Sequence, residues 1–139
     1  MNIKKKLRGY ISAKQQLERE KDFLRELNAT IVYGQTAFKD MPGSKSWHKD
    51  KLGKTAARLL DLQRKHTNTY EALVNEIELL DKWYNTLPEN IYKTALYYRF
   101  FKGMSWVPIQ HKLGNHKTAD ALRVGVNDLI ATNSMNYGK

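Results

Sequence analysis

The sequence predicts an all-α protein in which a long antiparallel, coiled-coil-like helical hairpin precedes a three-helix helix-turn-helix module. Prolines occur only at positions 42, 88 and 108, so that long helices can form between them. Apolar residues recur every seven residues in the first two intervals. Shorter apolar runs follow residue 88 and are separated by glycines, which is typical of short helices joined by turns. A chain of 139 residues is long enough for one structural unit of this kind.

The first interval carries one apolar stripe, which predicts a helix of about thirty residues. The stripe repeats with a period of seven at Ile3, Tyr10, Leu17, Leu24 and Ile31, and is widened by Leu7, Ala13 and Leu27. Turn-forming residues then concentrate in the segment DMPGSKS at 40–46, where the periodicity stops. We therefore expect a loop at about 40–50.

A second heptad series predicts the other arm of the hairpin, so that residues 1–87 form one element. Its positions alternate in steps of four and three, as in a coiled-coil seam: Leu52, Ala56, Leu59, Gln63, His66, Tyr70, Leu73, Ile77, Leu80, Tyr84 and Leu87. Gln63 and His66 interrupt the seam, either to fix its register or because the seam is locally solvated. An intermolecular coiled coil, and hence a homo-oligomer, satisfies the same pattern.

Residues 88–132 are expected to form the three-helix module, and 133–139 a polar tail. Pro88 suits the first turn of a helix that Gly103 ends. Ser105 is the expected N-cap of the next helix, and Trp106 is expected to anchor its apolar face in the core. Gly114 suits the turn before the last helix because glycine adopts a left-handed backbone at little cost. That helix directs inward Ala119, Leu122, Val126, Leu129 and Ile130.

The charge of the chain points to an anionic partner. Lysine and arginine number 24 against 14 acidic residues, which gives a formal net charge of +10. Nucleic acid is the first candidate and an acidic membrane surface the second. The basic cluster at residues 4, 5, 6 and 8 either binds phosphate or membrane, or only keeps its end of the chain soluble.

Other functional classes find little support in the sequence. The chain has no cysteine, which excludes disulfides and thiolate chemistry and is compatible with a reducing cytoplasm. No pairing of nucleophile and base and no phosphate-cradling glycine loop occurs, so we expect neither an enzyme nor a cofactor. His111 and His116 flank Gly114 but lack further ligands, so no metal site is expected. No apolar run reaches the roughly 18 residues of a membrane span.

The two helices joined at Gly114 match the pattern of a helix-turn-helix, whose second helix enters the major groove of DNA. The early residues of that helix would then contact phosphates or base edges. The expected phosphate contacts are Lys102, Lys112, Lys117 and Arg123, and the expected base contacts are His116, Thr118 and Asn127.

Several short motifs follow one another in a characteristic order between residues 40 and 130. They are Gly43-Ser44, Asp50-Lys51-Leu52, AARLLDLQ at 56–63, LYYRFFKGMSW at 96–106, Ile109 and Lys112-Leu113-Gly114. In these motifs the chain resembles a family of small phage and prophage proteins of unknown function. The C-terminal part of that family is similar to region four of sigma factors and to the ArpU/RinA-type regulators of phage late genes. The resemblance implies a phage-type transcription regulator that acts on double-stranded DNA in the cytoplasm of a bacterial host.

Two alternatives stay open at this stage. The predicted recognition helix contains Asp120, whose carboxylate repels phosphate, and Gly125, which costs a helix roughly 1 kcal/mol. Ile109 is followed by Gln110, where the family usually has alanine. These features favour a protein-interaction module with a degenerate motif, which captures RNA polymerase or another phage or host protein through its helices. The second alternative is a small terminase-like DNA-packaging subunit, which also combines a helix-turn-helix with oligomerising helices.

Overall fold

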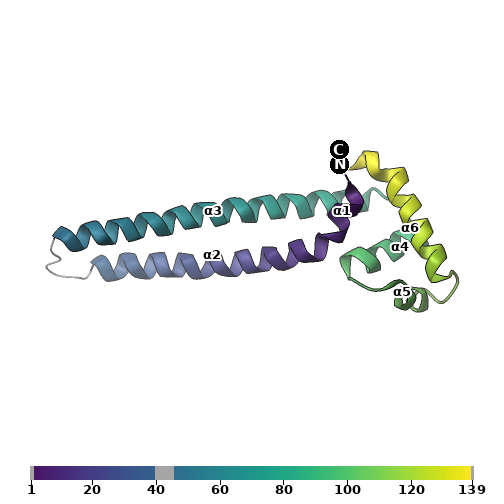
Figure 1. Cartoon of the computed structure of the whole chain (residues 1–139), viewed down its shortest axis with the longest axis horizontal. Helices are drawn as coiled ribbons and strands as arrows, with labels where there is room; N and C mark the ends of the chain where they lie inside the picture. The colour runs from purple at the N-terminus through teal and green to yellow at the C-terminus, as the bar shows by residue number, and fades with distance from the viewer. Residues whose placement is uncertain (1, 40–45, 139) are drawn as a thin grey trace. The chain divides into compact units, whose positions relative to one another are not determined.

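The structure is a computed structural model that describes residues 2–39 and 46–138, with the side chains of 33–53 outside the description. The described residues form helices and no strand, so the predicted all-α class is confirmed. The helices are α1 (Ile3–Arg8), α2 (Tyr10–Lys39), α3 (Ser46–Asn85), α4 (Ile91–Leu96), the π-helical η1 (Tyr97–Phe101), α5 (Trp106–Lys112), α6 (Ala119–Asn133) and the short 3₁₀ turn η2 (Ser134–Asn136) (Figure 1).

The boundaries of the helices correct the sequence prediction in three places. The first stripe is divided between α1 and α2 at Gly9, whose N–H donates to the carbonyl of Lys5 at 3.2 Å. Pro88 lies before α4 and not in its first turn, because Asn90 is the N-cap and its side chain accepts from the N–H of Lys93. Residues 40–45 of the predicted loop lie outside the described residues, and α3 already begins at Ser46.

The chain divides into two compact units. One combines Met1–Gln15 with Asn75–Lys139, and the other is Gln16–Val74. The prediction from sequence had kept residues 1–87 together. The difference arises because apolar residues of α1 and of the last turns of α3 are buried together with those of the C-terminal helices, as Ile3, Leu7 and Leu80 illustrate.

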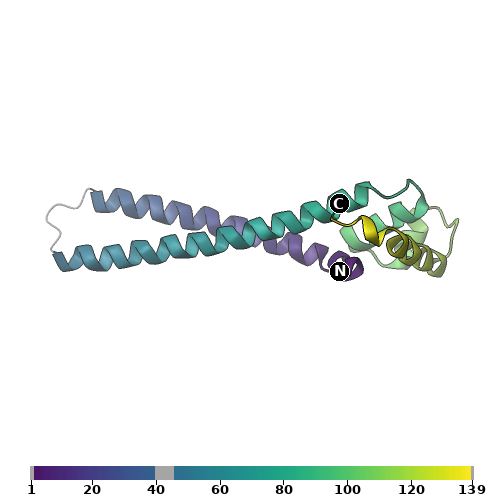
Figure 2. The same ribbon diagram turned by 90° about the horizontal axis from the view of Figure 1, so that it is seen from above.

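In the unit Gln16–Val74, segments of α2 and α3 lie side by side and run antiparallel (Figures 1 and 2). Residues that interrupt the apolar seam are paired across it. The side-chain amide of Gln63 donates to Asn28 Oδ1, and His66 Nδ1 lies 2.6 Å from Glu20 Oε2. The ring of Phe23 packs on His66, with 4.3 Å between the ring centroids. The polar positions of the seam are therefore specific contacts between the two helices.

The other unit has a continuous apolar core. Its largest fully buried side chain is Trp83, which is 1% exposed and donates from Nε1 to the carbonyl of Asn133 at 2.8 Å. Trp106, the expected anchor, is only half-buried. The core also contains Ile3, Leu7, Tyr10, Ile77, Leu80, Leu87, Ala95, Leu96, Phe100, Ile109, Leu122, Val126, Leu129 and Ile130. This core fixes α1 and α6 in the same folded body.

Tyr10 gives this core a measurable pH dependence. Its ring stacks on Phe101 with centroids 4.4 Å apart, and its hydroxyl donates to Asp81 Oδ1 at 3.3 Å. Burial and, second, the negative charge of Asp81 raise the pKa of Tyr10 to about 12, from an ordinary value of 10. Because the folded-state pKa is the higher one, the stabilisation is complete below pH 10 and is lost as the pH rises toward 12.

We therefore expect the wild-type chain to lose up to about 2 kcal/mol more unfolding free energy than Tyr10→Phe between about pH 9 and 12. Urea titrations at several pH values in this window measure the difference. Parallel curves for the two proteins would show that Tyr10 is not protonated preferentially in the folded state.

Candidate functional site

The segment that joins α5 to α6 holds the start of α6 firmly. Gly114 and Asn115 both have left-handed backbones, with φ of 80° and 59°. Thr118 is the N-cap of α6, and its side chain accepts from the N–H of Ala121 at 3.1 Å. From α5, the side chain of Gln110 accepts from the N–H of Ala119 at 2.9 Å. Two otherwise unpaired amides of the first turn are thereby satisfied, which fixes α6 relative to α5.

Helix α6 also approaches α4 very closely at Gly125. A Cβ atom built on Gly125 would lie 2.1 Å from Cε1 of Tyr92, well inside van der Waals contact. The glycine that weakens the predicted recognition helix thus makes room for a tyrosine ring. Gly125 therefore has a packing role. Its presence is compatible with a binding function of the exposed face of α6.

Three of the predicted phosphate-binding lysines lie over tyrosine rings of α4 and η1. The Nζ atoms of Lys102, Lys112 and Lys117 lie 5.7, 4.8 and 5.6 Å from the ring centroids of Tyr97, Tyr98 and Tyr92, respectively. All three lysines are exposed. A ring face attracts an ammonium without neutralising its charge, so these lysines are oriented and still able to bind an anion.

Arg123 and Asn127 lie on the side of α6 that is roughly opposite Gly125. Arg123 is two positions from Gly125, which corresponds to about 200° around a helix. Arg123 and Asn127 line a cavity of about 250 Å³, hereafter the α1–α6 cavity. The other residues that line it are Lys4, Arg8, Arg99, Phe100 and Trp106.

The structure therefore brings only part of the predicted site together. Arg123 and Asn127 share the α1–α6 cavity, while Lys112, His116, Lys117 and Thr118 belong to the end of α5 and the turn that follows it. His116 is exposed, and the hydroxyl oxygen of Thr118 is engaged as the N-cap. Lys102 lines a separate cavity of about 520 Å³ together with Tyr10, Lys14 and Asp81.

Sequence reasoning did not connect Lys4, Arg8 and Arg99 with the residues of α6. The signal in the sequence was the spacing of Lys4 and Arg8, which places both on one face of a helix. The sequence predicts the basic N-terminal cluster either as a separate phosphate or membrane contact or as a solubilising end of the chain. Its proximity to α6 depends on the burial of Ile3 and Leu7 in a core shared with the C-terminal helices.

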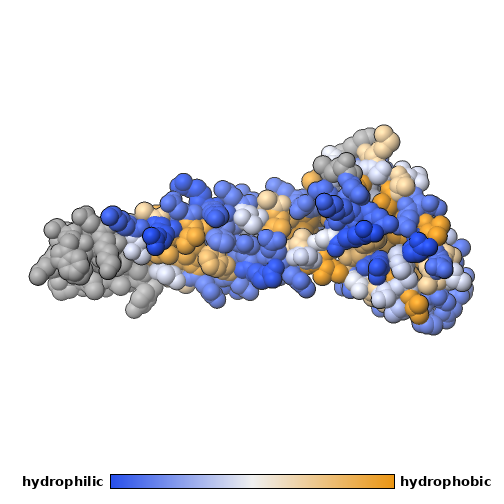
Figure 3. Space-filling model, viewed as in Figure 1, coloured by the Kyte–Doolittle hydropathy of each residue, from blue (hydrophilic) through white to orange (hydrophobic). Residues whose placement is uncertain are grey.

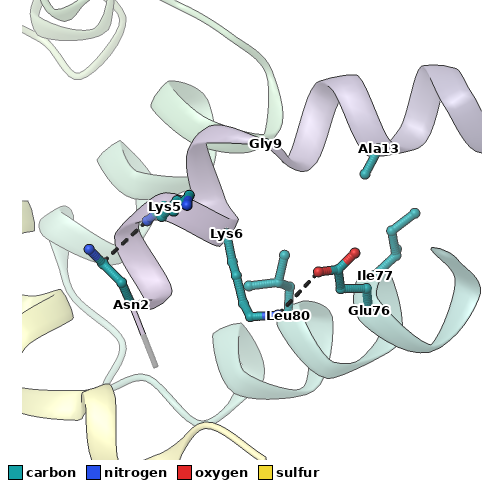
Figure 4. Close-up of a pocket in the computed structure, with 8 residues that line it drawn as sticks. All are labelled: Asn2, Lys5, Lys6, Gly9, Ala13, Glu76, Ile77 and Leu80. Carbon is teal, nitrogen blue, oxygen red and sulfur yellow. Dashed lines mark hydrogen bonds and ion pairs between the residues drawn. The ribbon is translucent and has the colours of Figure 1, made fainter. Parts of the chain in front are cut away.

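Another cavity in the same unit is lined by both signs of charge. It measures about 380 Å³ and lies between α1, the start of α2 and the last turns of α3 (Figure 4). Lys6 Nζ reaches across it to Glu76 Oε1 at 3.1 Å, as the dashed line shows. This hydrogen bond to Glu76 is the main reason why the pKa of Lys6 is raised above its ordinary value. The pairing neutralises the charge of Lys6 in this cavity.

The surface is predominantly hydrophilic on the face that Figure 3 shows, with hydrophobic residues in small separate patches. Among the residues that the structure describes, no helix is long and apolar enough to cross a membrane. Within the same residues, no group of three or more His, Cys, Asp or Glu side chains could hold a metal ion.

Comparison of the chain with protein-family models, curated proteins and solved structures gives no match.

The contact between Gly125 and Tyr92 can be tested with a pair of substitutions. Gly125→Ala adds a methyl group where the ring lies, and we expect a loss of about 1 to 3 kcal/mol of unfolding free energy, despite the better helix propensity of alanine. In a Tyr92→Ala background the same change should be neutral or stabilising. Denaturant titrations of the four proteins measure this coupling, and additive effects would contradict the close approach.

Proposed function

We propose that the chain is a DNA-binding transcription regulator of phage type, similar to the ArpU/RinA-type regulators, and that it works in the cytoplasm of a bacterial host. Its C-terminal helices would act as a helix-turn-helix, with α6 facing the major groove of double-stranded DNA. The resemblance of the motifs between residues 40 and 130 and the basic net charge of +10 both support this proposal.

The observation that carries the proposal is the arrangement around the start of α6. Its first turn is fixed by Gln110 from α5 and by its own cap at Thr118. The exposed cations Lys112 and Lys117 precede it, and the exposed Arg123 follows in its second turn. A rigid helix start bordered by cations can dock on the phosphate backbone with little loss of conformational entropy.

Asp120 is the acidic residue at this helix start, and it is partly compensated within the helix. Its Oδ1 lies 3.7 Å from Nε of Arg123, one turn further along. The side chain of Asp120 is 93% exposed and that of Arg123 is 50% exposed, so the pair is weak and easily rearranged. Arg123 can therefore turn toward a phosphate without breaking a buried contact.

The lysines at the turn provide the test of DNA binding. In Lys112→Ala/Lys117→Ala we expect weaker binding to every duplex sequence. The slope of log Kobs against log salt concentration should become shallower by about 2, because each phosphate contact releases about one counterion. Fluorescence anisotropy with labelled duplexes at several salt concentrations measures both quantities.

Arg64→Ala/Lys65→Ala removes the same charge from exposed positions in the unit Gln16–Val74, and is the matched control. This control should keep the wild-type slope. Absence of wild-type binding at about 50 mM salt, where phosphate contacts are strong, would reject the proposal and favour a module that captures a phage or host protein. A ring-forming oligomer that binds DNA would instead favour the small terminase-like subunit.

A further inference from the structure

The α1–α6 cavity collects four cationic side chains from three segments of the chain. Lys4 and Arg8 come from α1, Arg99 from η1 and Arg123 from α6. Phe100, Trp106 and Asn127 complete the lining, which includes no carboxylate, and Asp120 outside it lies 3.7 Å from Arg123. By contrast, Glu76 lines the cavity that contains Lys6, and Asp81 lines the cavity that contains Lys14 and Lys102.

Arg99 is held in place before any ligand arrives. Its Nη1 donates to the carbonyl of Met104 at 3.1 Å, and its guanidinium carbon lies 5.4 Å from the ring centroid of Trp106. A guanidinium has five N–H groups, so this single bond leaves donors available for an anion. The half-buried Trp106 is itself one of the residues that line the cavity.

The size and charge of the cavity define the ligand class. About 250 Å³ is smaller than the roughly 300 to 1,000 Å³ of sites for whole small molecules. Guanidinium and ammonium groups around such a space suit a compact oxyanion, and arginine matches the geometry of phosphate best. Asn127 adds an amide that can donate to the same oxygens.

We propose that the α1–α6 cavity binds a phosphate group, supplied by the DNA backbone beside α6, and that α1 provides two of its cations. The source of the phosphate rests on the proposed function, because Arg123 and Asn127 belong to the helix that would face DNA. Inorganic phosphate offers the same chemistry without nucleic acid. The N-terminal helix is then a direct part of the DNA-binding surface.

The test compares two double variants with the same spacing and the same loss of charge. Lys4→Ala/Arg8→Ala removes the contribution of α1 to the cavity. Lys54→Ala/Arg58→Ala removes an exposed pair, also four residues apart, from α3 in the other unit. Circular dichroism establishes that both fold, and Lys4→Gln/Arg8→Gln replaces the first variant if shorter side chains unfold α1.

Salt-dependent titration with a DNA duplex is the first measurement. We expect the salt slope of Lys4→Ala/Arg8→Ala to become shallower by about 1, since its two cations share one phosphate, while Lys54→Ala/Arg58→Ala keeps the wild-type slope. Equal slopes for the two variants, with normal wild-type binding, would overturn the cavity inference and leave the proposed function standing.

Titration with inorganic phosphate at constant ionic strength is the second measurement, read from the NMR signals of the arginine Nε–H groups of Arg99 and Arg123. Another outcome is a wild type that responds to phosphate without binding any duplex. If Lys4→Ala/Arg8→Ala then abolishes the phosphate response and the control variant retains it, the result would support a phosphate site in the cavity and would reject DNA as the source of the phosphate. Absence of both responses in the wild type would overturn both proposals.

Discussion

The close contact between α4 and α6 at Gly125 constrains the rest of the C-terminal helices. With Tyr92 seated against the backbone of α6, the rotation of α6 about its axis is set. That rotation buries Leu122, Val126 and Ile130, and turns Arg123 toward the cavity shared with α1. The turn before α6 then places Lys117 over the ring of Tyr92. The close packing that glycine permits at position 125 thus helps to determine how the basic residues are distributed over two faces.

The helix α1 is too short to be stable by itself, since six residues form fewer than two turns. It holds its shape because Ile3 and Leu7 are buried and because its N-cap Asn2 accepts from the N–H of Lys5. The positions of Lys4 and Arg8 are therefore a product of tertiary packing. Their charge alone, in a flexible segment, would attract nucleic acid without defining where a phosphate lies.

The sequence could predict those features of the structure that depend on neighbouring residues in the chain. The all-α class followed from periodicity, and the left-handed backbone at Gly114 followed from glycine in a turn. What failed depended on contacts between distant segments. Trp83 and not Trp106 fills the core, since its indole reaches the carbonyl of Asn133, fifty residues away. Similarly, nothing local to Arg123 indicates that Lys4 and Arg8 lie across a cavity from it, and no local rule relates Gln110 to the N–H of Ala119.

The polar contacts between α2 and α3 restrict how the two helices can slide past each other. A seam of identical apolar heptads fits nearly as well after a slip of seven residues, since leucine then meets leucine. Such a slip here would move Glu20 from His66 to the neighbourhood of Leu59 or Leu73, and would leave a carboxylate without its partner in an apolar seam. Asn28 and Gln63 would be separated by the same movement. The two pairs thus act against misaligned pairing during folding, when the apolar residues alone would accept several alignments.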